Sequence, residues 1–567
     1  MSSKTLNNAG SKKTLSGFVY SNSFIFCALW LVVFILYFPA AQAGRVGDFP
    51  GWVRFLNSVN FVDYINRSES GIRSLYQFTQ IITLLFYKMF GANAWLWHLL
   101  YVTLQVTNAF LLFIFCRRLF FDSGVKNPSL VAIAGALLFC VCPHISEVVV
   151  WEPAFHFLLG FLLILLVLVC AQHFIHTGRQ KFAWWGGVLF FLSSYSLEVF
   201  YLTPLFVVTL GVFYRTTHSI DKTRFSKLVK YFSLPQLLIV SSYFIVLQLM
   251  YHGGVAHLEN KSLEFGVSNF SKPLKYIFHI VFFGRYFPTG IRQQVYRFCE
   301  SAIGLAAFYC LSAAVVLYVA VRIRQMDKKG KSIALLFTWV VFALALILPL
   351  WFPQTGLVIY DRYTYVLDGI FYMLLALFVS NFTGKYAFIA ITTAYALANL
   401  RFAHKVITYW QQSAHIVNNL VYTFPNDPTK KVLLLDLPEC LEGIQMVGSR
   451  DDGEFQMMYN AIMPHKITNP VYDVEAYYLH GPGDGAGVNV INDSTIRVTL
   501  SQWGSWWLYY GFGAMNYENS DYKVNMLDPG HMYELILKHP ADQYLLLFEA
   551  GDEWKVVDWS KKNVNQY

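Results

Sequence analysis

The chain has 567 residues, of which 56% are hydrophobic, 18% aromatic and only 14% charged. Soluble domains carry about 25% charged residues, so this composition excludes an ordinary soluble protein and indicates a membrane protein with several spans. The eight cysteines lie mostly in or beside apolar runs, so they predict neither a disulfide framework nor a zinc site.

The net charge of +9 is unevenly distributed along the chain. Residues 1–404 hold 32 Lys and Arg against 14 Asp and Glu, whereas residues 405–567 hold 11 against 20. Two chemically different parts are therefore predicted to join near residue 404. The predicted organisation is a cytoplasmic leader at 1–22, a transmembrane domain at 23–404 with outer loops at 42–92 and 252–299, and a soluble periplasmic or luminal domain at 405–567.

Apolar runs of roughly the 20 residues that a helix needs to cross a bilayer recur along the first part. The first run follows a basic leader and lacks a clear small-residue cleavage site, so it is predicted to be a retained anchor. The fold class predicted is an all-α polytopic membrane protein with about 11 transmembrane helices, followed by a C-terminal soluble α+β domain. The predicted spans are 23–41, 93–116, 129–143, 153–175, 183–197, 199–214, 232–251, 300–321, 333–351, 364–380 and 385–403.

Basic loops decide the predicted orientation, because Lys and Arg accumulate on the cytoplasmic side. The leader, Arg117–Arg118, the 215–230 stretch and "RIRQMDKKGK" (322–331) fall on one side of an alternating topology. The opposite face then receives the turn containing Glu147 and the whole acidic tail. Two further stretches on that face, 74–90 and 273–287, are apolar but short, and they predict helices lying in the membrane interface beside an outer cleft.

The acidic tail carries strand patterns at 431–439, 494–502 and 543–559, the last as a hairpin about Gly551–Asp552. Its stretch "QWGSWWLYYGF" (502–512) is rich in aromatic residues. Aromatic faces stack on sugar rings, which makes a glycan platform one interpretation. Packing inside the domain or against the membrane is the other, and aromatic residues are more often used in this way.

Acidic residues recur at successive outward turns: Asp48, Glu147, Glu198 and Asp361. Each has an ordinary structural interpretation, such as a turn residue for Asp48 or a helix cap for Glu198. The neighbouring Arg362 is explained equally well as a side chain reaching the headgroup level. Their recurrence at one membrane face points instead to function, because acids near the membrane are costly and usually functional.

Four stretches in order resemble one branch of the GT-C membrane glycosyltransferases, the protein O-mannosyltransferases and the transmembrane tetratricopeptide-repeat O-mannosyltransferases. The stretches span the chain between residues 20 and 405, and each is short. They are "YKMFGANAWLWHLLYVTLQVTNAFLLFIFCRRLF" (87–120), "PHISEVVVW" (143–151), "SSYSLEVFYLTP" (193–204) and "DRYTYV" (361–366). Three departures leave metal use and the acceptor open: a single Asp48 where that branch pairs two acids, Leu197 in place of a basic residue, and no repeat array.

The resemblance implies a hexosyl- or pentosyltransferase that moves a sugar from a polyprenyl-phosphate donor to an acceptor on the outer side of the membrane, usually with inversion. Such a transfer needs a carboxylate to take the acceptor proton and cations to stabilise the leaving phosphate. Asp48 is the expected base, with Glu147 as the second catalytic residue, and Arg362, Arg285 and Lys275 are the expected phosphate ligands. The supporting candidates are His144, Glu198, Asp361, Tyr363, His98 and Arg73.

A divalent cation held by Asp48, Glu147 and His144 stays open, because one His and two acids are not a specific metal signal. The implied partners are the lipid-linked sugar donor, a protein, lipid or polysaccharide acceptor and the membrane lipids, with no nucleic acid. The expected location is a bacterial inner membrane in preference to the endoplasmic reticulum.

Two other classes of function use the same outer acids differently. A transporter or flippase of lipid-linked sugars would use them as a cation or proton site, but such proteins favour inverted repeats and sites near the middle of the membrane. A non-catalytic scaffold would use the bundle only to display the tail. Substitution of Asp48 by Asn separates the enzyme from both alternatives.

Overall fold

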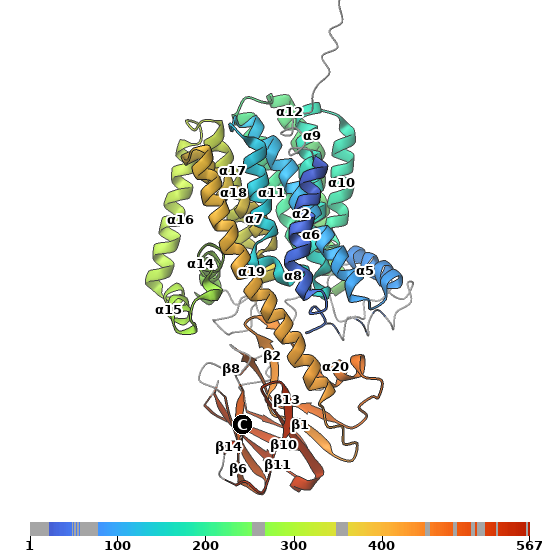
Figure 1. The fold of residues 1–567 in the computed structure, drawn as a ribbon. Coiled ribbons are helices and arrows are strands. Elements are labelled where there is room, and N and C mark those ends of the chain that lie inside the picture. The colour runs from blue at the N-terminus through green and yellow to red at the C-terminus, as the bar shows by residue number, and fades with distance from the viewer. Residues whose placement is uncertain are drawn as a thin grey trace, which may run out of the picture.

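A computed structural model describes residues 22–47, 49, 53, 56, 77–251, 267–347, 361–447, 454–479, 485–500, 505–506, 516–528, 531–562 and 565–566. Within these residues the chain forms a bundle of long helices with a smaller domain of strands at one end (Figure 1). We call the end of the bundle that meets this C-terminal domain the junction end. The predicted fold class, a helical membrane-type part followed by a C-terminal domain that contains strands, is confirmed.

The bundle is built from eleven helices among the described residues. They are α2 (Asn22–Tyr37), α6 (Ala94–Asp122), α7 (Pro128–Cys140), α9 (Phe155–Thr177), α10 (Gln180–Ser194), α11 (Thr203–Thr216), α13 (Leu234–Tyr251), α16 (Ala302–Arg322), α17 (Lys328–Ile347), α18 (Tyr365–Phe382) and α19 (Lys385–Tyr422).

Fewer of these helices qualify as spans than the eleven expected. By length and composition, eight described helical segments are long and apolar enough to cross a membrane, and a ninth counts if α7 and the bent segment after it form one span. The predicted spans 183–197 and 385–403 do form helices, but they do not meet this standard. α10 has only 15 residues and begins Gln-Lys, and α19 carries polar side chains such as Asn399 and Arg401.

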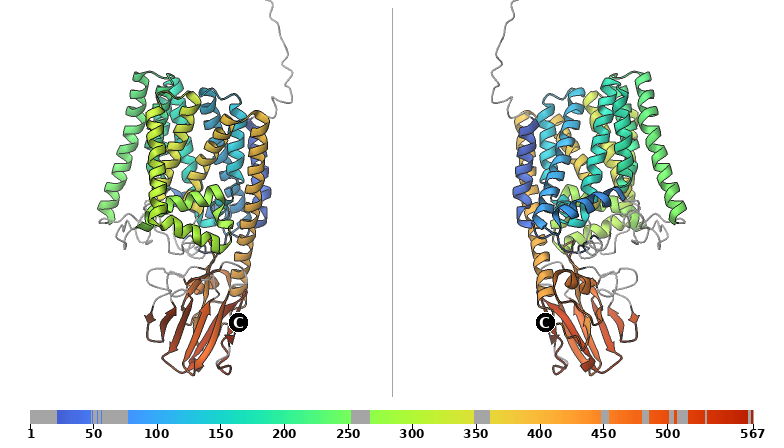
Figure 2. Two further views of the ribbon diagram at one scale, coloured as in Figure 1. Left: turned by 90° about the vertical axis from the view of Figure 1, so that its left-hand side faces the viewer. Right: turned by 90° about the vertical axis from the view of Figure 1, so that its right-hand side faces the viewer.

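Short elements gather at the junction end, and Figure 2 shows the α14 and α15 region lying across the foot of the long helices. The predicted interfacial stretches 74–90 and 273–287 fall mainly in helices α5 and α14. The short elements at this end are α5 (Gln77–Phe90), η2 (Pro143–Ile145), α8 (Ser146–Val150), η3 (Glu152–Ala154), η4 (Glu198–Leu202), α14 (Val267–Phe282), η6 (Gly284–Tyr286), α15 (Thr289–Glu300) and η7 (Asp361–Thr364). The opposite end carries α12 (Lys222–Leu228) and η5 (Val229–Ser233).

Close helix packing holds the junction-end elements in place. α7 and α18 meet at Gly135, where an added Cβ atom would come within 2.6 Å of the Met373 sulfur. Asn108 of α6, fully buried, donates a hydrogen bond to the Tyr365 hydroxyl of α18 over 3.0 Å. Because a buried amide needs such a partner, this contact fixes the start of α18 against α6.

α19 is a single helix of 38 residues that leaves the bundle and enters the C-terminal domain (Figure 1). Inside the bundle, the Trp410 indole donates to the Ser146 hydroxyl over 3.4 Å. At its far end, Asn419 donates to Asp552 over 2.8 Å. The change in charge near residue 404 therefore lies within a continuous helix, with the first strand beginning at Lys431.

The C-terminal domain contains three sheets in the described residues, with orders β13-β12-β1-β4, β14-β6-β7-β11-β10-β9 and β3-β2-β5-β8. β1 pairs in parallel with both β12 and β4. The strands and short helices are β1 (Lys431–Leu434), β2 (Leu437–Leu441), β3 (Ile444–Gln445), α20 (Glu454–Ile462), β4 (Val471–Asp473), β5 (Ala476–Leu479), β6 (Ala486–Asn492), β7 (Thr495–Leu500), β8 (Ser505–Trp506), β9 (Tyr517–Glu518), β10 (Tyr522–Asp528), β11 (Met532–Leu537), η8 (Ala541–Gln543), β12 (Tyr544–Ala550), β13 (Glu553–Val556) and β14 (Asn565–Gln566).

The three strand patterns expected in this domain are confirmed. The first becomes β1 and the start of β2, the second becomes β7, and the third becomes the β12–β13 hairpin. In that hairpin Ala550 pairs with Glu553, and Gly551 adopts a φ of 82°, which glycine tolerates without strain. Most of the aromatic stretch 502–512 lies outside the described residues.

Candidate functional site

A break after α7 brings the predicted Glu147 segment to the junction end. Pro143 cannot continue α7, because its ring removes the backbone donor that an interior helical position needs. The chain bends by 52° and restarts as η2 and α8. His144 and Glu147 are both buried as a result.

Glu147 is paired with Arg362. One carboxylate oxygen accepts a hydrogen bond from the Arg362 guanidinium, and the other accepts from the Arg362 backbone N–H over 2.8 Å. That backbone group lies in η7, at the start of α18, where helical N–H groups lack partners within the helix. Glu147 therefore satisfies a backbone N–H of η7, which leads into α18, and holds the arginine side chain as well.

The Arg362 guanidinium also lies over two aromatic rings. Its central carbon is 5.0 Å from the ring centroid of Trp151 and 5.0 Å from that of Tyr363. Stacking on these rings restricts the side chain while its charge remains at the junction end.

Asp361 forms the centre of a second group of contacts. One of its oxygens accepts from the Arg285 guanidinium, and the other is 2.7 Å from His279 Nε2. His144 Nδ1 is 3.7 Å from the same oxygen as His279, and the two imidazole rings are 4.3 Å apart between centroids. Asp361 is only 2% exposed, so this carboxylate is held almost wholly inside the protein.

His279 is neutral at ordinary pH in this setting. Burial, with His144 contributing, lowers the pKa of His279 to about 4, and the hydrogen bond with Asp361 opposes that shift only in part. A neutral imidazole carries one proton, so the short contact to Asp361 assigns that proton to Nε2.

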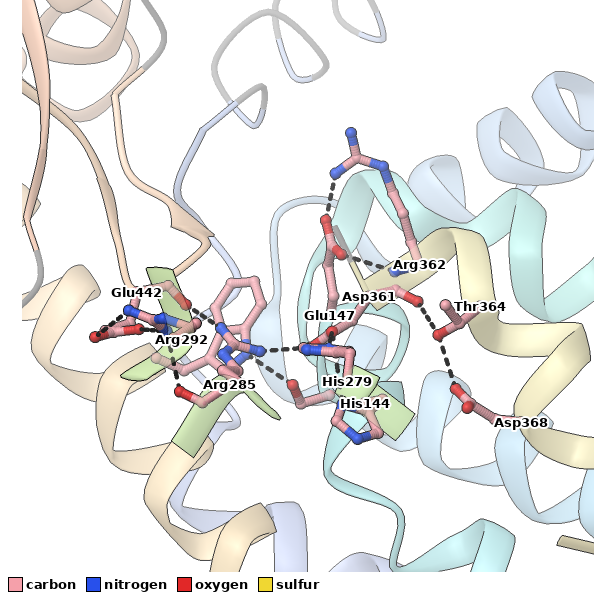
Figure 3. A network of polar contacts seen from close by, with 12 residues as sticks. His144, Glu147, His279, Arg285, Arg292, Asp361, Arg362, Thr364, Asp368 and Glu442 are labelled. Atoms are coloured by element: carbon pink, nitrogen blue, oxygen red, sulfur yellow. Dashed lines mark hydrogen bonds and ion pairs between the residues drawn. The ribbon is translucent and has the colours of Figure 1, made fainter. Parts of the chain in front are cut away.

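The C-terminal domain completes this group through Glu442, in the turn between β2 and β3. Its backbone carbonyl accepts from Arg285, and its carboxylate accepts from Arg292 over 2.9 Å. Arg292 is fully buried and also donates to the Arg285 carbonyl over 3.0 Å. Figure 3 shows Arg285 lying between Asp361 and Glu442, so that one arginine bridges the bundle and the domain.

We call these residues the junction network. It holds three carboxylates and three guanidinium groups, so its formal charges balance when both histidines are neutral. Paired in this way, the buried charges offset the desolvation cost that each would have alone. The members are His144, Glu147, His279, Arg285, Arg292, Asp361, Arg362 and Glu442.

The network contains five of the residues singled out from the sequence, namely His144, Glu147, Arg285, Asp361 and Arg362, with Tyr363 beside it. Lys275 lies apart and forms an ion pair with Glu300, and His98 is buried in α6 at an edge contact with the Trp95 ring. Glu198 lies in η4, but its side chain is not described. Asp48 and Arg73 lie outside the described residues.

The segment leading to Asp48 is nevertheless described as far as Gly47. The Val46 carbonyl accepts a hydrogen bond from the Trp151 indole over 3.0 Å. The same indole ring underlies the Arg362 guanidinium. The chain therefore comes within two residues of Asp48 while still beside a neighbour of the junction network.

Sequence reasoning missed four polar residues here: His279, Arg292 and Asp368, which are buried, and Glu442, which is half-buried. His279 could have been found, because it follows Lys275 by one helical turn on the predicted interfacial stretch. The Thr364 hydroxyl oxygen lies 2.9 Å from an Asp368 carboxyl oxygen and 2.8 Å from the Asp361 carbonyl oxygen, so it links the two acids. Glu442 gave no signal, because its partners lie 150 or more positions away in the chain.

One set among the described residues has the geometry to hold a metal ion: His144, His279 and Asp361, whose ligand atoms lie within 4.8 Å of one another. Both ring nitrogens of His144 are buried without a hydrogen-bond partner among these residues. A bound ion would replace the hydrogen bond from His279 to Asp361, while Arg285 holds the other oxygen. Of the metal candidates drawn from the sequence, Asp48, Glu147 and His144, this set contains only His144.

Among solved structures, the chain is similar to the crystal structure of ArnT from Cupriavidus metallidurans bound to undecaprenyl phosphate. It is 14% identical, with a TM-score of 0.33, and the alignment covers 82% of this chain and 93% of that chain. No family model matches the chain, and no curated protein matches it. At this level of similarity, no residue of one chain is placed on a residue of the other.

Proposed function

We propose that the protein is a GT-C-type membrane glycosyltransferase that moves a sugar from a polyprenyl-phosphate donor to an acceptor hydroxyl at the junction end. The observation that carries the proposal is the junction network. Residues from four separate stretches of the chain converge there, and they combine buried carboxylates with arginines. A purely structural ion pair does not require three carboxylates and three guanidinium groups to meet in one region with two histidines.

The proposed reaction is an inverting displacement. The acceptor oxygen attacks the anomeric carbon while its proton passes to a carboxylate, and the bond from that carbon to the phosphate oxygen breaks. The electron pair leaves with the polyprenyl phosphate, whose added negative charge needs cationic partners. Both substrates therefore meet where an acid and arginines lie together.

Asp48 is the proposed base, and Glu147 is proposed to orient the acceptor. Both Glu147 oxygens already accept hydrogen bonds from Arg362, which favours a positioning role for this carboxylate. The described path of residues 46–47 beside Trp151 supports an approach of Asp48 to the same region.

Arg362 and Arg285 are proposed to bind the phosphate of the donor, with Lys275 assisting. Arg362 is stacked on two rings, so its planar group is held in place for bidentate contact with phosphate. Lys275 lies on α14 with His279, on the same junction-end helix.

The prenyl chain is proposed to follow an apolar groove of about 410 Å³ lined by Phe270, Leu305, Ala306 and Tyr309, between α14 and α16. α14 therefore carries the groove near its start and His279 near its end. This arrangement suits a donor with an apolar tail and an anionic head. We further propose that the junction end faces the periplasm of a bacterial inner membrane.

The test is turnover of synthetic polyprenyl-phosphate sugars by the purified full-length protein in nanodiscs, with release of polyprenyl phosphate measured by chromatography. A panel of hexosyl and pentosyl donors is assayed with wild type, Asp48→Asn and Glu147→Gln. We expect wild type to consume at least one donor, and Asp48→Asn to reduce turnover by about 100-fold or more while the donor still binds.

Asp122→Asn is the matched control, because Asp122 lies in an ion-pair group at the opposite end of the bundle with His176 and Arg118. Its turnover should stay within a factor of three of wild type. Movement of the lipid-linked sugar across sealed vesicles without donor consumption would identify a transporter and overturn the proposal. Unchanged turnover in Asp48→Asn would remove that residue as the base.

A further inference from the structure

The turn at the tip of the β2–β3 hairpin has an unusual residue for its geometry. Leu441 pairs with Ile444, so Glu442 and Gly443 form the whole two-residue loop. Both have positive φ, 49° at Glu442 and 85° at Gly443. Asn, Asp and Gly are favoured at such positions in two-residue hairpins, whereas a glutamate there is strained. A strained residue that the surroundings hold in place points to a role for its side chain.

Glu442 contacts two arginines with two different groups. Its backbone carbonyl accepts from Arg285, and its carboxylate accepts from Arg292 over 2.9 and 3.5 Å. Arg292 also holds the Arg285 backbone carbonyl. The turn therefore fixes Arg285 at both its guanidinium and its backbone, directly and through Arg292.

The same hairpin contacts the segment that leads to Asp48. The Gly47 backbone N–H donates to the Met446 carbonyl, one residue after β3. A Cβ atom at Gly47 would lie 3.0 Å from the Gln445 side chain, so the two segments pack closely. The β2–β3 hairpin thus contacts both Arg285, a proposed phosphate ligand, and the segment that leads to Asp48, the proposed catalytic base.

We propose that Glu442 is a positioning residue for glycosyl transfer, and that the β2–β3 turn of the C-terminal domain sets the direction in which Arg285 points within the junction network. The inference rests on the proposed function, because Arg285 is taken as a ligand of the leaving phosphate. Without the Glu442 carboxylate, Arg292 is left buried with less compensation and its hold on Arg285 weakens. The C-terminal domain is then part of the site.

The experiment compares Glu442→Gln with Glu534→Gln in the full-length protein. Glu534 pairs with Arg497 over 2.7 Å across β7 and β11, within the sheet of the same domain. Both variants remove one carboxylate that contacts one arginine. We expect Glu442→Gln to lower kcat about 10-fold or more with a smaller change in donor KM, and Glu534→Gln to change neither by more than twofold.

Arg292→Met and the double variant with Glu442→Gln complete a double-mutant cycle. If the two residues act together on Arg285, the double variant loses no more kcat than the worse single variant. Two outcomes would overturn the proposal and leave the turn with a structural role only. One is full additivity of the two losses in kcat. The other is a Glu442→Gln variant with a lowered melting temperature and a kcat equal to that of wild type.

Hydrogen exchange of residues 284–300 provides a readout that does not depend on turnover. We expect faster amide exchange there in Glu442→Gln than in wild type or Glu534→Gln, because the turn holds η6 and α15. If wild type consumes no donor, the proposed function fails, while this exchange measurement still tests the turn. Unchanged exchange at 284–300 would overturn the positioning role.

Discussion

Buried carboxylates occur in two regions of the molecule, and their surroundings differ. In the junction network, Glu147 and Asp361 each accept hydrogen bonds from an arginine. Inside the C-terminal domain, Asp436 is fully buried and accepts from the Glu549 backbone N–H over 2.7 Å, with its other oxygen lacking a hydrogen-bond partner among the described residues. Glu147 and Asp361 are therefore each paired with a cation, whereas Asp436 accepts from a backbone N–H.

The pKa of Asp436 shows what a buried acid does without a cation beside it. Burial raises the pKa of Asp436 well above its usual range, and the nearby Glu549 carboxylate raises it further. A neutral carboxylic acid serves as a structural hydrogen-bonding group. The contrast teaches that burial alone does not identify a site for charged chemistry; the arginines of the junction network make the difference.

The largest expected effect comes from Asp361→Asn. This variant removes the charge partner of Arg285 and leaves that arginine buried, which costs about 3–5 kcal/mol when a buried pair is broken from one side. Turnover with the preferred donor should fall about 100-fold or more. Asp122→Asn should lower turnover less than threefold. Equal losses of turnover in the two variants would contradict the proposed difference between the two ends of the bundle.

Because Asp361→Asn can also destabilise the protein, size-exclusion profile and melting temperature are measured beside turnover. Arg362→Lys provides a milder change in the same network. Lysine keeps the charge but loses the planar group that stacks on Trp151 and contacts Glu147, so we expect a loss of about 10- to 100-fold with an intact fold. Wild-type turnover in Arg362→Lys would show that charge alone suffices at this position.

Asp436→Asn should stabilise the C-terminal domain at neutral and basic pH. The raised pKa means that the folded state holds the proton more tightly than the unfolded state, so this acid favours folding below pH 4 and loses that contribution as pH rises toward its folded pKa. Asparagine stays neutral at every pH. We expect a gain of about 1 kcal/mol at pH 7.5, or roughly 2–4 °C in Tm, and almost none at pH 4.

Asp521→Asn is the opposite control in the same domain. The hydrogen bond from Lys431 lowers the pKa of Asp521, with the Tyr472 hydroxyl contributing over 2.9 Å. This acid therefore stabilises the fold above its unfolded pKa and loses that contribution as pH falls. Asp521→Asn should lower Tm at pH 7.5. If Tm moved in the same direction in Asp436→Asn and Asp521→Asn, the predicted difference between these two acids would be wrong.

The smallest expected effect is that of Lys275→Met. Lys275 pairs with Glu300, whose side chain is 45% exposed, and pairs of this kind contribute about 0–1 kcal/mol. We expect donor KM to rise by less than about fivefold, with little change in Tm. A loss as large as that of Arg362→Lys would move Lys275 from an assisting role to a principal one.

Much of the architecture could be predicted from the sequence, because it depends on local patterns. Long apolar runs predicted the helices of the bundle. A strand pattern on both sides of the Gly551–Asp552 turn predicted the β12–β13 hairpin. Among the described residues, eight or nine segments meet the length and composition standard against the eleven spans predicted, because α10 and α19 are helices that do not meet it. Helical periodicity alone does not reveal that difference.

The site was predictable only in part. The acids at successive turns identified Glu147 and Asp361. Arg362 was identified beside Asp361, and Arg285 on the predicted interfacial stretch 273–287. The pairing between them depends on tertiary contacts more than 70 positions apart, which no local pattern records. Whether Asp48 joins them stays a prediction, since that residue lies outside the described part of the chain.

α19 has a mechanical consequence for the molecule. At 1.5 Å per residue, its 38 residues form a rod about 57 Å long that is anchored at both ends. Adding one residue to the rod below the bundle would turn everything beyond it by about 100°. The tip of the β2–β3 hairpin would then be displaced from Arg285. The length and the rotational phase of α19 therefore set the contact between the C-terminal domain and the bundle.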